Sequence, residues 1–351
     1  MRLNYILSEF KKNWLIASIG IALYVFGFII LNINEGRAFN HSRALEEALQ
    51  KAVSFKEADY QRQNGKSENY EGKLIHVSGY VRVQEPIADA TYNILVQAVK
   101  LRKIVQMYQW HEDYTENKFA EGDETARNYF YYKDWSENVV DSRSFHSLGH
   151  QNPRQLPMQS RMMIADKTYI GNFEIGESAK ELFTGWIDVT SDTRPEDPYI
   201  KMHLGWYFHV DDLYDPLVGD TRVKFQFAGL QGSVYTIVGK LVNGKIEPYK
   251  SNLKKKIILL SKGELTIEEI FKEEHYAVRK KTWIIRLFGF VLIFFGVIST
   301  SSLLRVFNRS RLSFLSPNPS CQLRSNIQIA GIFTITICIL RQSLHYLGIM
   351  T

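Results

Sequence analysis

The sequence has little cysteine, with two residues in 351 and none between residues 34 and 282. So few cysteines exclude a disulfide framework and a cysteine-rich zinc site. The hydrophobic fraction of 45% and the charged fraction of 23% are ordinary for a folded chain, which excludes a disordered, collagen-like or coiled-coil protein. A chain of this length forms two or three domains, or one domain together with membrane spans.

Acidic residues are missing from the C-terminal part of the chain. From His275 to Thr351 there are nine basic residues and no acidic one, whereas residues 34–274 contain 36 acidic and 31 basic residues. The basic excess therefore lies beside apolar runs, where it directs membrane topology. Because no dense phosphate-neutralising patch remains, we expect no nucleic-acid partner.

Two apolar runs have the length of membrane spans. Trp14–Ile33 is a run of 20 residues without a charge, and at about 1.5 Å per residue it spans roughly 30 Å, the thickness of a bilayer core. It is too long for a signal-peptide core, and no small-residue cleavage motif follows it. Trp283–Leu304 is the second predicted span, with Arg286 near enough to its start to reach the headgroups.

A third apolar run, Ile327–Leu340, has only 14 residues and is followed by Arg341. Part of it alternates like a strand, and an open strand cannot cross a bilayer because its backbone groups would remain unpaired. A third span that extends to Ile349 and an interfacial segment both remain open.

The charges flanking the first span predict the orientation. Arg2, Lys11 and Lys12 precede it, which places residues 1–13 in the cytoplasm. Residues 34–282 then lie on the opposite side of the membrane, and residues 305–351 form a basic cytoplasmic tail. Lys280 and Lys281 oppose this orientation, whereas the absence of cysteine from residues 34–282 agrees with it.

The middle of the chain is predicted to be an α+β, β-rich extracytoplasmic domain between the transmembrane helices. We expect a helix at Asn40–Phe55 after a short linker, Asn34–Arg37, and a final helix capped by Thr266 and Glu269 that runs directly into the second span. Connections this short predict that the domain rests against the bilayer. Alternating patterns predict strands, with a hairpin turn at Asn243-Gly244: Lys73–Val83, Leu101–Trp110, Tyr129–Lys133, Thr221–Phe227, Tyr235–Val242 and Lys245–Glu247.

Several residue groups resemble parts of known catalytic or metal sites, and each lacks a required element. The segment 64–67 lacks the first glycine of a phosphate loop, and Val77-Ser78-Gly79 has His76 where a nucleophile elbow has glycine. The remaining groups lack the helical context, the second histidine or the spacing of a metal site: His146 with His150, His111 with Glu112, and Asp211, Asp212, Asp215 with Asp220. We therefore predict no catalytic, cofactor-binding or metal-binding residue and no cofactor.

Aromatic residues are densest at Tyr129–Tyr132 with Trp135. A well-packed strand accounts for this group. A headgroup-level or partner-facing patch is the alternative, because tyrosine and tryptophan suit surfaces that are apolar at one end and wet at the other.

Seven segments together resemble the transmembrane protein 43 family, also called LUMA. Their order and spacing hold from about Trp14 to Arg305. The segments are Asn34-Glu35-Gly36-Arg37-Ala38, Glu71–Gly79, Met107–Trp110, Tyr132–Ser136, Gly149–Pro153, Val218–Val223 followed by Ala228-Gly229-Leu230, and Lys281-Thr282-Trp283. After Arg305, where members carry two further long spans, the chain departs from the family, which identifies it as a bacterial-type member with a divergent or truncated C-terminus.

The resemblance implies a non-enzymatic membrane protein with a large extracytoplasmic or lumenal domain. Eukaryotic members act as oligomeric organisers of the endoplasmic reticulum and inner nuclear membrane, with lamins and emerin as partners, and channel-related roles are also proposed for them. For this chain we expect a homo-oligomeric scaffold in contact with the lipid bilayer and other membrane proteins. It would lie in the inner membrane of a bacterium, or in the endoplasmic reticulum or inner nuclear membrane of a eukaryote. A channel subunit is the alternative, and an enzyme is the third reading.

The orientation can be tested by cysteine labelling. Single cysteines placed within residues 60–260 should react with a membrane-impermeant thiol reagent only from the side opposite the cytoplasm. The reason is that the positive charges at Lys11–Lys12 and Arg305–Arg311 keep the segments that contain them in the cytoplasm. A cysteine at residue 8 serves as the control and should react only from the cytoplasmic side. Cytoplasmic labelling within 60–260 would reverse the predicted orientation.

Overall fold

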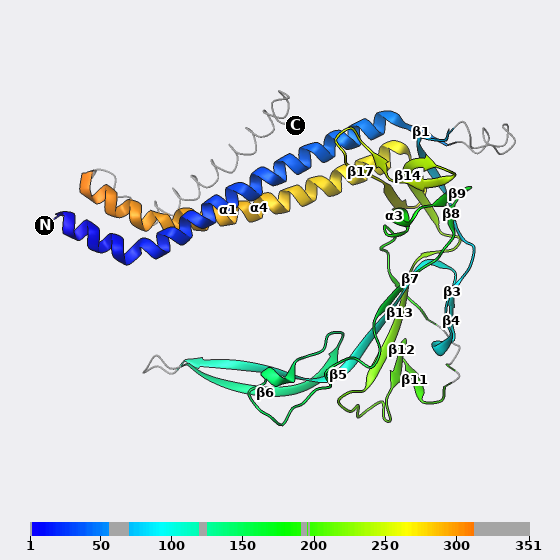
Figure 1. Cartoon of the computed structure of the whole chain (residues 1–351), viewed down its shortest axis with the longest axis horizontal. Coiled ribbons are helices and arrows are strands. Elements are labelled where there is room, and N and C mark those ends of the chain that lie inside the picture. The colour runs from blue at the N-terminus through cyan, green and yellow to red at the C-terminus, as the bar shows by residue number, and fades with distance from the viewer. Residues whose placement is uncertain (1, 56–69, 119–124, 191–194, 196, 312–351) are drawn as a thin grey trace. The chain divides into compact units, whose positions relative to one another are not determined.

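The structure is a computed structural model that describes residues 2–55, 70–118, 125–190, 195 and 197–311 (Figure 1). The chain forms two compact units. The helical unit comprises residues 1–52, 249–257 and 266–351, and the β unit comprises residues 53–248 and 258–265. The segments 34–51 and 266–282 therefore belong with the apolar helices, whereas the sequence assigned them to the extracytoplasmic domain.

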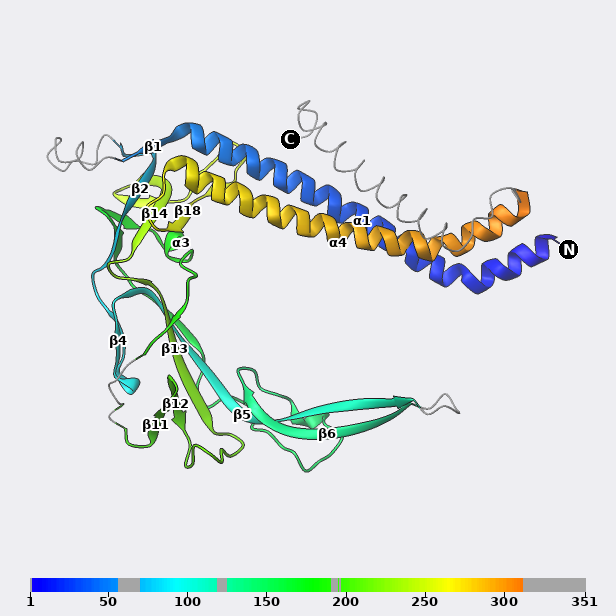
Figure 2. The same ribbon diagram turned by 180° about the vertical axis from the view of Figure 1, so that it is seen from behind.

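The helical unit contains two long antiparallel helices, α1 (Arg2–Lys51) and α4 (Ile267–Arg311). Figures 1 and 2 show them side by side. Both are long and apolar enough to cross a membrane. At about 1.5 Å per residue, the 50 residues of α1 extend for about 75 Å, more than twice the thickness of a bilayer core. Each helix therefore continues well past its apolar run.

Glycines bring the two helices into close contact. Gly20 and Gly27 on α1 and Gly289 and Gly296 on α4 recur at intervals of seven residues, the repeat that keeps one helix edge against an antiparallel neighbour. A Cβ atom at Gly296 would lie 2.7 Å from the carbonyl oxygen of Gly20. Small residues allow such backbone approach between membrane helices, where packing replaces the hydrophobic effect as the source of association.

The predicted linker between the first span and a separate helix is wrong. The α1 helix runs without a break through Asn34–Arg37 and ends at Lys51, where β1 (Ala52–Ser54) begins. Asn34 and Glu35 resemble the polar end of a span, but both find partners on α4: the Asn34 amide donates to the carbonyl of Thr282, and Glu35 pairs with Arg286. Because the helix pair supplies these partners, the helix continues.

The start of α4 confirms the capping box. The backbone N–H of Thr266 donates to Glu269 Oε2 at 2.8 Å, and the N–H of Glu269 donates to the Thr266 hydroxyl at 3.3 Å. This exchange satisfies two backbone donors that a helix start otherwise leaves unpaired. The predicted continuity across Lys280–Trp283 is also confirmed, since α4 is unbroken there.

The outer end of α1 is attached to the segment 249–257, which forms β16 (Tyr249–Lys250) and β17 (Lys256–Ile257). The Glu47 carboxylate accepts hydrogen bonds from Lys51 Nζ at 2.7 Å, from the Tyr249 hydroxyl at 2.8 Å and from the Asn252 N–H at 3.0 Å. The Lys51 ammonium, with Tyr249 and Asn252, holds the pKa of the Glu47 carboxyl below its usual value, and Glu47 raises the pKa of Lys51 to about 12.

The first sheet of the β unit closes on itself. Ladders join β2 to β8, β8 to β9, β9 to β15, β15 to β14, and β14 back to β2, so that five strands form a ring with β1 and β18 at its sides. In spatial order the strands are β1, β2 (Leu74–Val83), β8 (Thr168–Ile170), β9 (Phe173–Ile175), β15 (Lys245–Glu247), β14 (Val234–Val242) and β18 (Leu259–Lys262).

The second sheet is built around β5 (Ala98–Lys118), a strand of 21 residues. Its first half pairs with β13, and its second half pairs with β6 in a long two-stranded ribbon. The other members are β11 (Ile200–His203), β12 (Trp206–His209), β13 (Thr221–Leu230), β6 (Thr125–Ser136), β10 (Ile187–Asp188) beside β13, and β7 (Arg161–Ile164) beside β5. The smaller elements are β3 (Ile87–Asp89), β4 (Ile94–Val96), η2 (Ala90–Tyr92), η3 (Ser142–Ser144) and α3 (Glu177–Lys180).

A hydrophobic core runs through both sheets and includes Ile75, Tyr92, Val105, Phe225 and Ile237. All six predicted strands are present, and the turn at Asn243-Gly244 has the positive φ angles, 52° and 75°, of a tight hairpin. The short strands β8–β12, which lie between residues 168 and 209, were not predicted, because runs of two to four residues carry no measurable alternation. The strand β2 passes through Gly79 unbroken, and a Cβ atom there would lie 2.8 Å from the backbone nitrogen of Gly171.

The glycine contacts lead to a stability prediction. Replacing Gly296 by valine places a branched side chain against the α1 backbone, and such overpacking costs about 1–3 kcal/mol. Thermal or denaturant unfolding of the full chain in detergent, followed by far-ultraviolet circular dichroism, should show this loss. Val291→Leu, at an exposed position of the same helix, is the control and should change stability by less than about 0.5 kcal/mol. Equal stability of the two variants would contradict close packing at Gly296.

Candidate functional site

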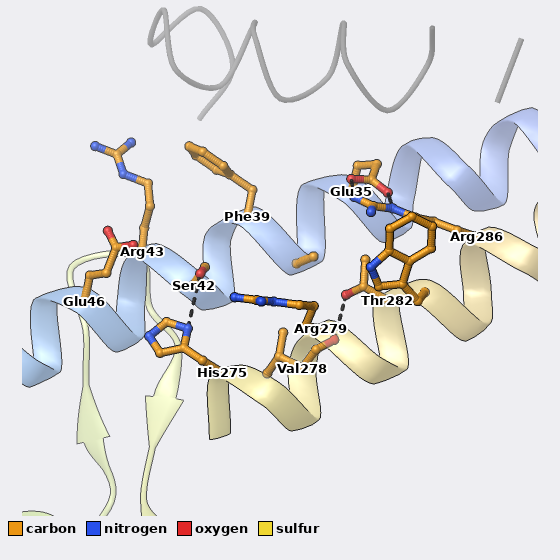
Figure 3. A pocket seen from close by; sticks show the side chains of 12 residues that line it. Glu35, Phe39, Ser42, Arg43, Glu46, His275, Val278, Arg279, Thr282 and Arg286 are labelled. Atoms are coloured by element: carbon orange, nitrogen blue, oxygen red, sulfur yellow. Dashed lines mark hydrogen bonds and ion pairs between the residues drawn. The ribbon is translucent and has the colours of Figure 1, made fainter. Parts of the chain in front are cut away.

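A groove of about 560 Å³ lies along the helix pair, at and beyond the point where the apolar runs end. Figure 3 shows its side chains, with Glu35 and Arg286 at one end and Arg43 and Glu46 at the other. The lining residues recur at the same intervals on both helices, namely 35, 38, 39, 42, 43 and 46 on α1 and 275, 278, 279, 282, 283 and 286 on α4. Intervals of three and four residues place side chains on one face of a helix, so each helix contributes one continuous stripe.

At the inner end of the groove, Arg286 and Glu35 form a two-pronged ion pair. Arg286 Nε and Nη2 donate to the two Glu35 carboxylate oxygens, each at 2.7 Å. The Glu35 side chain is 2% exposed and that of Arg286 is 18% exposed. Parallel N–H···O bonds between a guanidinium and a carboxylate are short, strong and geometrically specific. The Arg286 guanidinium also lies over the Trp283 ring, 4.9 Å from its centre.

In the middle of the groove, a weaker contact joins the two helices: the Ser42 hydroxyl on α1 lies 3.5 Å from Nδ1 of His275 on α4. The Thr282 hydroxyl donates to the Val278 carbonyl of its own helix at 2.8 Å. Arg279 extends from α4 into the space between the helices (Figure 3). Within the described part of the chain, neither Arg279 nor Arg43 forms an ion pair. Arg43 instead lies 5.5 Å from the centre of the Phe39 ring.

A second groove of about 520 Å³ is lined by the same two helices together with Lys255, and it shares Ala38, Val278 and Thr282 with the first groove. Here the Asn34 amide nitrogen lies 3.3 Å from the Thr282 carbonyl oxygen, and His41 Nε2 lies 3.3 Å from Glu274 Oε1. Both members of the His41–Glu274 pair are about one-third exposed. Among the described residues, the buried Glu35–Arg286 ion pair and the more exposed His41–Glu274 hydrogen bond further out thus both join the two helices.

Two of the histidines considered from the sequence stack on the β5–β6 ribbon. The His146 ring lies flat on Tyr129 with centres 4.4 Å apart, and the His150 ring lies flat on Tyr131 at 3.9 Å. The Tyr131 hydroxyl donates to Glu112 Oε2 at 2.6 Å. These contacts fold the segment that contains both histidines over one face of the ribbon.

The remaining groups considered from the sequence take part in local hydrogen bonds and stacking. His111 stacks on Tyr132, and the Ser78 hydroxyl lies 2.8 Å from that of Thr236. Asp212 and Asp220 accept backbone N–H groups within their own turn. His76 Nε2 lies 2.9 Å from the Leu265 carbonyl oxygen, and burial holds the pKa of this imidazole below its usual value. The segment 64–67 lies outside the described residues, and no group of three possible metal ligands occurs among the residues that the structure describes.

The aromatic group at Tyr129–Tyr132 divides between the two faces of β6. Tyr129 and Tyr131 are covered by the stacked histidines, whereas Phe130 and Tyr132 are 46% and 45% exposed. Trp135 packs against Tyr108 and Phe208. The packed-strand interpretation therefore describes one face of the group, and the headgroup-level or partner-facing patch stays a prediction for the exposed face.

Comparison with known proteins places the chain in a family. The sequence model of "Transmembrane protein 43" matches residues 107–345. The chain belongs to the transmembrane protein 43 family. It is 39% identical over 342 residues to the "Transmembrane protein 43 homolog" of Drosophila melanogaster, with 95% of this chain and 90% of the fly protein covered. It is 28% identical to transmembrane protein 43 of Rattus norvegicus and 27% identical to that of Homo sapiens, in each case over 80% of this chain and 72% of the relative.

Family membership agrees with the two apolar helices and the β-rich middle region expected of a membrane protein. The expected departure from the family after Arg305 is wrong, because the family match continues to residue 345. The relatives named here are animal proteins, and they give the expected bacterial-type assignment no support. The alternatives for Ile327–Leu340 lie outside the described residues. No solved structure matches the chain.

The sequence analysis does not predict the Glu35–Arg286 pair. It places Arg286 at the headgroups by itself and assigns Glu35 no partner. The available signal was one acidic residue just past the first apolar run and one basic residue just inside the second, which meet when the helices are antiparallel. The polar stripes are also not predicted, because apolar periodicity alone does not reveal them.

The pair leads to a prediction with a matched control. Glu35→Ala leaves the Arg286 charge partly buried without this partner, and breaking such a pair costs about 3–5 kcal/mol. The exchange Glu35→Arg with Arg286→Glu should recover most of that loss. Glu274→Ala breaks the more exposed pair with His41 and should cost about 1 kcal/mol or less. Denaturant unfolding of the full chain in detergent measures all three, and equal losses for Glu35→Ala and Glu274→Ala would contradict a special role for the buried pair.

Proposed function

We propose that this chain is a non-enzymatic, membrane-anchored scaffold that oligomerises and organises complexes of other membrane proteins. The observation that supports this proposal most directly is the unbroken helix pair joined at Glu35–Arg286. Helices that continue past the apolar runs and are cross-linked by a buried pair resist bending and sliding. A scaffold needs a fixed connection between its membrane anchor and the parts that bind partners.

Exposed apolar side chains on loops of the β unit supply candidate contacts. Leu148, Tyr199 and Tyr214 are 88%, 80% and 91% exposed. The loops that carry Leu148 and Tyr214 are adjacent, since a Cβ atom at Gly219 would lie 3.5 Å from the Pro153 ring. Tyrosine is enriched in protein interfaces because it offers a large contact area together with a polar group.

The test compares two exposed sites of the β unit. In the full chain, Leu148→Asp combined with Tyr214→Asp should reduce co-purification of other membrane proteins from native membranes, and should reduce the fraction of multi-step photobleaching events that report oligomers. Leu95→Asp, at a residue that is 69% exposed on β4, is the control and should leave both unchanged.

Two outcomes would contradict the scaffold. A single photobleaching step and no specific co-purification for the parent chain would exclude an oligomeric organiser. Single-channel currents from the purified chain in a planar bilayer would favour the channel alternative. The glycine and apolar contacts between α1 and α4 provide no polar lumen in the described part of one copy, so such a pore would have to be built from several copies.

A further inference from the structure

Two arginines in the groove form no ion pair with any carboxylate of the described residues. Arg43 and Arg279 line the same groove from opposite helices, and neither forms an ion pair with a described residue. The Glu35 carboxylate in the same groove is already paired with Arg286, which leaves Glu46 at the outer end as its other acidic residue. The lining therefore offers guanidinium N–H groups to an acceptor that the described chain does not supply.

The depth of the groove matches a membrane headgroup region. Arg279 precedes Trp283, the first residue of the predicted second span, by four residues, which corresponds to about 6 Å along the helix. Arg43 follows Ile33, the last residue of the first predicted span, by ten residues, or about 15 Å. The headgroup layer extends for about 5–8 Å beyond the hydrocarbon core, so the Cα atom of Arg279 lies within this layer. The Cα atom of Arg43 lies beyond it, and a long arginine side chain can extend from there toward the phosphates.

The chemistry of the lining combines cations with apolar and aromatic surface. Phe39, Val278 and Trp283 line the groove beside the arginines. Tryptophan is enriched at the membrane interface because its ring is apolar and its N–H is polar. Arginine binds phosphate through two parallel hydrogen bonds, which lysine cannot reproduce. The volume of about 560 Å³ is that of a small-molecule site.

We propose that this groove binds the phosphate-containing headgroup of an anionic membrane phospholipid through Arg43 and Arg279. The binding rests on insertion of the two apolar helices and does not require the scaffold function. A lipid is favoured over free phosphate because the groove opens where the apolar runs end and places aromatic surface beside the cations. The bound headgroup would then join the outer parts of α1 and α4 on the side of the pair that lacks the His41–Glu274 contact.

Native mass spectrometry of the full chain, purified in detergent and titrated with phosphatidylserine and phosphatidylcholine, measures this binding. The parent chain should bind phosphatidylserine more tightly than phosphatidylcholine. Arg43→Ala combined with Arg279→Ala should weaken phosphatidylserine binding at least about tenfold, since each basic residue near a membrane surface contributes about 1 kcal/mol. Lys280→Ala is the matched control, because Lys280 is an exposed neighbour of Arg279 that lines neither groove, and it should leave the preference intact.

Further variants separate the remaining explanations. Arg43→Lys with Arg279→Lys should retain part of the preference and the parent's helix content, which distinguishes loss of the site from loss of the fold. If Lys280→Ala weakened phosphatidylserine binding as much as the double arginine variant, the binding would reflect general surface charge rather than this groove. If phosphatidylserine binding were lost only in the variant that combines Arg37→Ala with Lys281→Ala, the lipid would bind in the second groove instead. Displacement of the lipid by millimolar inorganic phosphate alone would identify the ligand as a free anion, and any of these last three results would overturn the proposal.

Membrane insertion and photobleaching are measured on the same variants. Because Arg43 and Arg279 lie outside the apolar runs, their replacement should leave the membrane insertion and the photobleaching result unchanged. Failure of lipid binding is therefore distinguishable from failure of the scaffold.

Discussion

The buried pair between Glu35 and Arg286 is the interaction on which the helical unit depends. A charge near the hydrocarbon boundary is costly without a partner, and each residue here supplies the partner of the other at 2.7 Å. The pair can form in only one register of the two antiparallel helices. It therefore selects the register in which the glycines meet and the polar stripes face one another.

The type of contact between α1 and α4 changes along the length of the two helices. Glycine and buried apolar side chains, including Leu31 and Ile293, pack the inner part. The ion pair lies where the apolar run of α1 ends, and the more exposed His41–Glu274 and Glu47–Lys51 contacts lie further along the helices. This order of contacts follows the change in dielectric environment along the helices. Van der Waals packing is effective between apolar helices in lipid, whereas exposed ion pairs contribute little in water. A buried ion pair between these zones is stable only with close geometry. The first groove occupies the zone between these regimes, where charge and apolar surface coexist.

The sequence predictions are correct where a feature depends on residues close together in the chain, and wrong where it depends on residues far apart in the chain. The capping box at Thr266 and Glu269 and the hairpin turn at Asn243-Gly244 depend on neighbouring residues, and both are present as predicted. The helix break at Asn34–Arg37 was predicted from local polarity and is wrong, because its polar groups are satisfied by residues about 250 positions away. The short strands β8–β12 were missed because their pairing partners, rather than their own patterns, define them.

The sequence by itself determined the two apolar helices, the β-rich region between them and membership of a membrane-protein family, since these follow from composition, period and spaced motifs. Only the tertiary structure decided that α1 is one unbroken helix, that β2 and β14 close a ring of five strands, and that twelve residues of two helices line one groove. The physical reason is that a residue's own properties determine local conformation and preference for lipid or water. Whether a buried polar group is satisfied depends on which distant residue the fold brings within hydrogen-bonding distance.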